Sequence, residues 1–212
     1  MSPEIALVAI VIVILSIIFH EVAHGYVANW LGDPTARLQG RLTLNPVPHI
    51  DPIGSLLIPG ILLLSGTPFL IGWAKPVPYN PYNLRHGKWG EALVSGAGPA
   101  VNIGIAIIFA LLLRLEVISS PLFLQVAILA IFANIALAII NLIPIPPLDG
   151  SKILRALLPY QAAIAYSRLE NMTYAFGPLG LIGILLLLVF VFSEFIFGFI
   201  RLIFSLLTGI AI

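Results

Sequence analysis

Residues 3–31 read PEIALVAIVIVILSIIFHEVAHGYVANWL, and this stretch decides the fold. It is apolar and long enough to cross a bilayer as one helix, and the Gly-Asp-Pro sequence at 32–34 is a stop signal directly after it. Residues 20–24, HEVAH, place three ionisable side chains inside this apolar helix. Because such groups are costly at bilayer depth, they indicate a functional site.

His20 and His24 are four residues apart and project from one face of a helix. Two imidazoles at this spacing can hold one Zn²⁺, with Glu21 beside them as a general base. The chain has no cysteine, so any zinc ligand must be His, Asp or Glu. The pattern predicts hydrolysis of a peptide bond within the membrane.

The composition indicates a multi-pass membrane protein. Of the 212 residues, 60% are hydrophobic and 9% are charged, which no soluble domain of this size requires. The net charge of +1 is close to neutral, so we expect no nucleic-acid partner. The first residues include Glu4 and no basic group, so we interpret them as the start of a membrane helix, not as a signal peptide. We expect one membrane-embedded domain over 1–212, with no appended soluble domain.

The first half of the chain predicts an all-α membrane protein with one irregular region. Further spans are expected at about 90–113 and 121–142. Between the first span and these, 37–44 alternates polar and apolar residues, which predicts a short strand or hairpin. Residues 53–65 are apolar but short for a span, and the prolines of 67–83 favour extended chain.

The second half predicts additional C-terminal helices around a catalytic core of about 3–158. Residues 150–175 are mixed and polar, which indicates one or two short surface helices. Residues 177–192 predict a further span. The tail, 193–212, is either a last span or a helix in the interface. Together, the C-terminal helices are expected to occupy about 159–212.

A third zinc ligand is expected, because a catalytic zinc usually has three protein ligands and one open position. Asp149 follows a proline-rich break after the 121–142 span, and Gly150 allows a sharp turn. The spans at 90–113 and 121–142 form a hairpin, so Asp149 lies at the end where that hairpin begins. If Asp149 meets the two histidines, residues 53–83 must be a re-entrant excursion, lining a wet cavity or buried in protein.

The basic residues give the orientation. One end of the spans collects almost all of them: Arg37, Arg41, Lys75, Arg85, Lys88, Lys152, Arg155 and Arg168. The loop at the other end has Arg114 alone. By the positive-inside rule, the metal-proximal end faces the cytoplasm, and we expect a multi-pass protein of a prokaryotic plasma membrane.

Four motifs together resemble the site-2 proteases, the family of intramembrane zinc metalloproteases. They are HEVAH at 20–24, GPAVN at 98–102, NLIP at 141–144 and LDG at 148–150, and the resemblance covers most of 15–158. It implies a core of three helices that carries the site. The chain resembles the compact subgroup, which has neither a PDZ domain nor a nucleotide-binding (CBS) domain.

The resemblance implies that His20, His24 and Asp149 bind one zinc ion and that Glu21 is the base. Ser151 stands where many members have a second glycine. The substrate implied is a transmembrane helix of another protein, partly unwound and cut by an endopeptidase in regulated intramembrane proteolysis. An extended edge near 37–44 or 67–80 could hold it by strand addition.

Asn102 is our candidate for a donor to the oxyanion, although it could equally bond a neighbouring helix. Asn141 is expected to fix a helix end, and His49 and Asp51 to make structural hydrogen bonds. Two other functions use the same residues: a metal-ion transporter, or an inactive membrane-binding protein on the same fold. The ionisable groups gather at one depth and at one end, and this favours catalysis.

Overall fold

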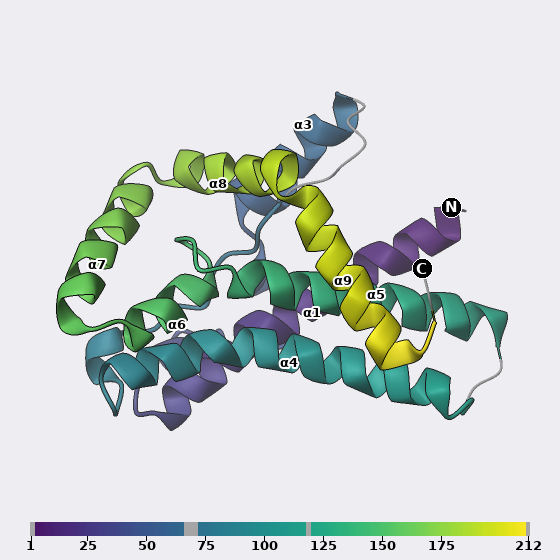
Figure 1. Cartoon of the computed structure of the whole chain (residues 1–212), viewed down its shortest axis with the longest axis horizontal. Helices are drawn as coiled ribbons and strands as arrows, with labels where there is room; N and C mark the ends of the chain where they lie inside the picture. Colours follow the sequence, from purple (N-terminus) through teal and green to yellow (C-terminus); the bar gives the residue numbers. More distant parts are fainter. Residues whose placement is uncertain (1–2, 66–71, 118–119, 211–212) are drawn as a thin grey trace.

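Three long helices form the body of the protein. The computed structural model describes residues 3–65, 72–117 and 120–210. Helices α1 (Pro3–Trp30), α4 (Lys88–Arg114) and α5 (Pro121–Leu142) run side by side along the long axis of the molecule (Figure 1). In the described part of the chain, these are the three helices long and apolar enough to cross a membrane. The long apolar helices predicted at about 3–31, 90–113 and 121–142 are therefore confirmed.

The long helices pack closely because small residues line their contacts. Ala106 and Ala110 of α4 and Ala127 and Ala130 of α5 are buried. In lipid there is little hydrophobic drive between helices, so close backbone approach at small residues supplies the packing energy. The remaining faces carry large exposed apolar residues, as expected for helices that contact lipid.

The predicted strand at 37–44 is wrong. Residues Thr35–Leu38 form a short helix, α2, which ends in a tight turn at Gly40, where φ is +65°. The backbone N–H groups of Gln39 and Arg41 bond to the carbonyls of Thr35 and Ala36, so they are not available for a ladder. Arg41 is buried whereas Leu38 and Leu44 are exposed, so the alternation of polar and apolar residues does not correspond to a pleated surface.

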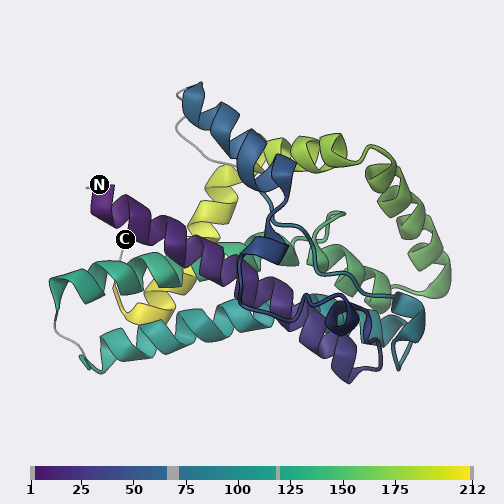
Figure 2. The same cartoon turned by 180° about the vertical axis from the view of Figure 1, so that it is seen from behind.

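The segment between α2 and α4 starts with helix and continues as extended chain. It contains η1 (Val47–His49), η2 (Pro52–Leu57) and α3 (Ile58–Leu64), and later η3 (Pro81–Asn83). Residues 72–80 are irregular and extended, as predicted, and residues 67–71 of the predicted extended stretch lie outside the described residues. The prediction is wrong at 81–83, where η3 replaces the extended chain. In Figure 2, α3 projects away from the three long helices. The re-entrant position of this segment in a bilayer stays a prediction.

Three contacts of Trp73 with Gly54 and Ser55 fix the return of the extended chain. The indole ring of Trp73 lies against Gly54, where an added Cβ would be 2.3 Å from the ring. The Trp73 backbone N–H donates to the Gly54 carbonyl, and the Ser55 hydroxyl donates to the Trp73 carbonyl. Only glycine at position 54 permits this approach.

Four shorter helices complete the chain: α6 (Asp149–Leu157), α7 (Tyr160–Ala175), α8 (Pro178–Val191) and α9 (Ser193–Thr208). One or two short helices were predicted at 150–175, and the structure has two there, α6 and α7. Helix α7 lies at the end of the molecule far from the N-terminus, and α9 crosses α5 obliquely (Figure 1). Helices α8 and α9 have 14 and 16 residues, fewer than the roughly 20 needed for an upright span. The further span at 177–192 stays a prediction.

Candidate metal centre

His20 and His24 lie on one face of α1, at its contact with α4. Their ring centroids are 4.6 Å apart and the rings are nearly perpendicular. Glu21 belongs to the same group, because one ligand atom from each of the three side chains lies within 4.8 Å of the others. Both imidazoles are buried, and the site faces Gly98 of α4.

Gly98 makes room for the two rings. A Cβ at this position would lie 2.6 Å from His20 Nε2 and 2.6 Å from His24 Nε2. Real Cβ atoms do not approach ring atoms so closely, so a larger residue would occupy the space in which the two nitrogens converge.

Asp149 reaches the same point from the first residue of α6. Its Oδ2 atom lies 3.2 Å from His20 Nε2 and 3.3 Å from His24 Nε2. Gly150 permits the turn, because a Cβ there would be 2.2 Å from the Leu142 carbonyl oxygen. Residues 129 positions apart in the sequence thus come together in one buried cluster.

The donor set fits a tetrahedral zinc ion. Zn–N and Zn–O distances of about 2.0–2.1 Å place neighbouring ligand atoms about 3.3 Å apart, close to the observed separations. Burial alone would raise the pKa of Asp149, but the His20 and His24 rings, when their Nε2 atoms carry protons, donate to the carboxylate and hold that pKa well below its usual range. The carboxylate is therefore ionised, as a metal ligand must be.

Each imidazole is oriented through its other nitrogen. The Nδ1–H of His20 donates to Asn102 Oδ1 at 2.6 Å, and the Nδ1–H of His24 donates to the Val94 carbonyl oxygen at 2.7 Å. Both acceptors are oxygens that carry no proton, so in the neutral rings the single proton stays on Nδ1 and Nε2 has a free lone pair for a metal ion. Both lone pairs thus belong to the nitrogens that face Asp149.

The Asn102 amide is fully buried and its donors are occupied. Its Nδ2 donates to Asn134 Oδ1 at 2.7 Å and to the Ser16 carbonyl oxygen at 3.3 Å. Asn134 in turn donates to the Ser16 hydroxyl at 2.8 Å. This relay of Ser16, Asn134, Asn102 and His20, the amide relay, joins α5, α4 and α1.

Glu21 faces the extended segment. Its Oε2 accepts a hydrogen bond from the Val77 backbone N–H at 2.9 Å. The same segment is held at Lys75, whose N–H donates to the His49 carbonyl and whose carbonyl accepts from Arg41 Nη2 at 2.8 Å. The chain at 72–80 is thus fixed against the motif helix.

The other polar candidates have local partners. His49 Nε2–H donates to the Thr43 carbonyl, and Asp51 accepts from two backbone N–H groups at the start of η2. Asn141 donates to the Leu137 carbonyl one turn earlier in α5. These contacts agree with the structural roles expected from the sequence.

Several contributors to the centre were not predicted. Val94 and Val77 act through backbone atoms, for which the side-chain pattern carries no signal. Asn134 and Ser16 are single polar residues within apolar helices, and this placement could have identified them. Gly98 was noted only as part of a motif.

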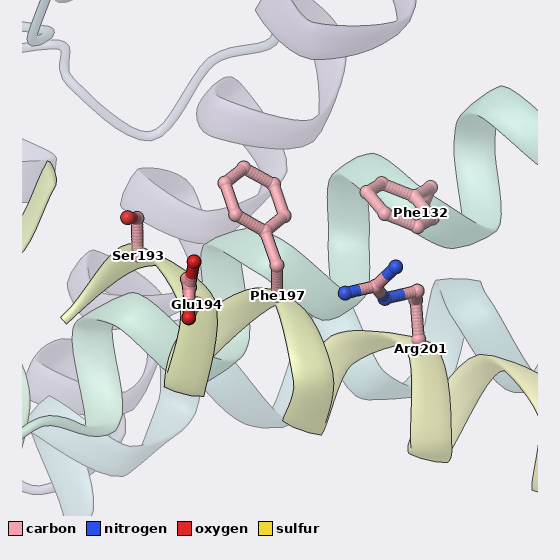
Figure 3. A pocket seen from close by; sticks show the side chains of 5 residues that line it. All are labelled: Phe132, Ser193, Glu194, Phe197 and Arg201. Atoms are coloured by element: carbon pink, nitrogen blue, oxygen red, sulfur yellow. The ribbon is translucent and has the colours of Figure 1, made fainter.

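A separate cavity of about 330 Å³ lies between α5 and α9 (Figure 3). Phe132, Ser193, Glu194, Phe197 and Arg201 line it. None of the residues of the metal centre contributes to it, so this cavity is not the candidate active site.

Two imidazoles, a carboxylate and an adjacent glutamate on membrane-type helices define a centre of the zinc metalloprotease class. The model of peptidase family M50 matches residues 116–190. A protein of Bacillus subtilis named "Putative zinc metalloprotease YwhC" is 39% identical over 158 residues, which cover 71% of this chain and 68% of that protein. The chain therefore belongs to peptidase family M50, the site-2 protease family.

More distant relatives carry the same description. The Rip2 proteins of Mycobacterium tuberculosis and Mycolicibacterium smegmatis are 34% and 30% identical over 139 residues, which is 65% of this chain. The chain spans about half the length of these mycobacterial proteins, 52% in each case. No solved structure matches the chain.

Proposed function

We propose that the protein is an intramembrane zinc endopeptidase, which hydrolyses a peptide bond in or near a transmembrane segment of a membrane-protein substrate. The observation that carries the proposal is the approach of Asp149 Oδ2 to both Nε2 atoms, at 3.2 and 3.3 Å. Such convergence of a buried carboxylate on two buried imidazoles is costly unless a positive charge lies there. One zinc ion held by His20, His24 and Asp149 would neutralise the carboxylate and use both lone pairs.

The bound ion would supply Lewis acidity for the scissile carbonyl and a water of lowered pKa. The Glu21 carboxylate then accepts a proton from the attacking water and returns one to the leaving amine nitrogen. The hydrogen bond from the Val77 N–H holds Glu21 in place for these two transfers. Asn102 and the Val94 carbonyl keep the two imidazoles in the required tautomer.

Asn102 was predicted as an oxyanion donor, but its contacts favour a different role. An oxyanion donor needs a free N–H, and both N–H groups of this amide have partners within the helices. We therefore assign Asn102 to the orientation of His20. The residue acts on the centre through the imidazole and not by contact with substrate.

The substrate is held by extended chain at 72–80 in this proposal. A helix must open before its carbonyls can be attacked, and an opened strand can pair with an existing extended segment. Pro76 and Pro78 have no N–H, and the Pro76 carbonyl already accepts from Arg41 Nη2, so Pro78 can offer a substrate strand its carbonyl but no N–H. The other candidate edge, 37–44, is not extended.

The cellular setting follows from the same proposal. The protein acts as one domain over 1–212 in a prokaryotic plasma membrane, with the lipid bilayer and a transmembrane substrate as its partners and no nucleic acid. The metal centre opens toward the cytoplasm, because the basic loops lie at that end.

The test is the Glu21→Gln variant, purified beside the wild type and given a model transmembrane substrate. We expect bound zinc to be retained, because the two histidines and Asp149 are intact, and cleavage to be lost. Glu116→Gln, the same change in the far loop, is the control and should cleave normally. Cleavage by Glu21→Gln at the wild-type rate would reject the mechanism, and zinc flux into liposomes at the wild-type rate would favour a transporter.

A further inference from the structure

Glu170 is a buried carboxylate that the proposed mechanism does not use. It lies on α7 and is 2% exposed. A buried charge is stable only when it is paired and hydrogen-bonded. Both oxygens have partners on α6: Oε1 accepts from the Ser151 hydroxyl at 3.1 Å, and Oε2 accepts from Arg155 Nη1 at 2.6 Å.

These contacts act on the helix that presents the third ligand. Ser151 and Arg155 are four residues apart and share one face of α6. Asp149 precedes Ser151 by two residues, a rotation of about 200° around the helix, so it projects from the opposite side. Glu170 therefore holds α6 from behind, while the carboxylate of Asp149 faces the imidazoles in front.

Asp149 depends on this support more than the histidines do. Each imidazole has an oxygen acceptor that fixes its orientation. Among the described residues, the Asp149 carboxylate has hydrogen-bonding contacts with the two imidazoles alone. Its position is therefore set by where α6 begins, not by a local hydrogen bond.

Arg155 extends the support to α4. Its Nη2 pairs with Glu91, which lies three residues before Val94 on the same helix. The Val94 carbonyl is the acceptor that orients His24. The ion pairs of Arg155 with Glu91 and Glu170 thus fix α6 and α7 against the turn of α4 that orients a second ligand.

We propose that Glu170 is a positioning residue of the zinc centre, which sets the place of Asp149 through the Ser151 hydroxyl and the Arg155 guanidinium. This inference rests on the proposed function, because it assumes that Asp149 is a zinc ligand. It adds α7, a helix with no ligand of its own, to the parts that determine metal affinity. Ser151 gains a role that glycine at this position could not fill.

The test is a double-mutant cycle on zinc affinity, with Glu170→Gln, Ser151→Ala and the double variant in the full chain. Zinc dissociation constants are measured by competition with a chelator. We expect each single variant to bind about 10-fold more weakly, the lower end of the range for outer-shell partners, and the double variant to lose less than the product of the two. Glu194→Gln, at an exposed position in the first turn of α9, is the matched control and should bind as the wild type.

A cobalt spectrum separates positioning from a general effect on stability. The visible d–d bands of the Co²⁺-loaded protein should shift in Glu170→Gln, because the carboxylate of Asp149 has moved, and not in Glu194→Gln. Unchanged affinity and bands in Glu170→Gln would overturn the inference, as would losses that multiply independently in the double variant. If Glu170→Gln does not fold, Ser151→Ala alone must show the shift, since it removes only one hydroxyl.

The two proposals fail in different ways. A wild-type protein that neither binds zinc nor cleaves removes the proposed function. A wild type that binds zinc and cleaves, with Glu170→Gln and Ser151→Ala equal to it in both respects, removes this inference alone.

Discussion

His20 and His24 are held by different kinds of acceptor, and this difference makes one of them easier to perturb. His20 donates to a side-chain amide, whereas His24 donates to the Val94 backbone carbonyl. A substitution can remove the amide but not the carbonyl. The orientation of the first imidazole is therefore open to mutation at Asn102, and that of the second is built into the main chain of α4.

Replacing Asn102 with alanine should weaken zinc binding about 10- to 100-fold, because the His20 ring loses the acceptor that fixes its tautomer. Chelator competition measures this. Asn141→Ala, which removes an amide away from the centre, should leave the affinity within about 2-fold. An oxyanion donor would give the opposite pattern, with normal zinc affinity and a kcat reduced about 100- to 1,000-fold.

Gly98→Ala should strongly reduce zinc binding, because the new methyl group would lie 2.6 Å from both Nε2 atoms. Gly104→Ala on the same helix is the control, since nothing lies within 4 Å of its Cβ position. The control should also be slightly more stable, by about 0.5–1 kcal/mol, because alanine is the better helix former. Zinc content after dialysis distinguishes the two variants, and equal content would contradict the close approach seen at Gly98.

At the residue scale, sequence predicted the side chains of the centre but not what holds them. The spacing of His20, Glu21 and His24 is typical of a zinc site with a general base. The hairpin of the spans at 90–113 and 121–142 places Asp149 at the same end of the molecule. Asn102 was a candidate oxyanion donor, yet the two acceptors of its N–H groups lie 32 and 86 residues away, and no local pattern indicates them.

At the element scale, sequence predicted long apolar helices well and irregular segments poorly. Helix α5 begins and ends at the predicted residues, because Pro121 starts it and the prolines at 144–147 follow it closely. The 37–44 error has a physical cause: a charged side chain, Arg41, is buried there and bonds to the carbonyls of Lys75 and Pro76. An alternating pattern cannot reveal such a tertiary contact.

Asp33 connects the end of α1 to the chain before α4. It is fully buried, and it accepts hydrogen bonds from the Thr35 hydroxyl, the Asn80 N–H and the Asn83 amide. Asp33→Asn should lower the free energy of unfolding by about 2 kcal/mol at pH 7, because the bonds to a charged acceptor are lost. Chemical unfolding in detergent measures the change, with Glu116→Gln as a control that should unfold as the wild type.

The contribution of Asp33 also depends on pH. Burial raises the pKa of Asp33, but hydrogen bonds from Thr35, Asn83 and Asn80 outweigh it and lower the pKa below its ordinary value of about 3.9. A carboxylate whose pKa is lowered in the folded state stabilises that state above about pH 3.9. This stabilisation is lost as the pH falls toward the pKa of the folded state. The difference between wild type and Asp33→Asn should be constant from pH 7 to about 5 and shrink below about 4. A difference that grows on acidification would contradict this.

At the scale of the whole molecule, the orientation can be measured because the chain has no cysteine. Tyr82→Cys lies at the metal-centre end and Val117→Cys at the other end, and both parent residues are well exposed. An impermeant maleimide should label Val117→Cys on intact cells and Tyr82→Cys only after permeabilisation. The reverse labelling would invert the topology.

The buried amides of α4 and α5 also determine how the whole bundle can be reused. Purely apolar helices in lipid could shift past one another by one turn at little cost in free energy. The hydrogen bonds among Ser16, Asn134 and Asn102 form in only one register of the three helices. A designer who grafts this chemistry into another scaffold must therefore carry three segments in fixed register. Copying the HEVAH helix alone would leave its first imidazole free to rotate.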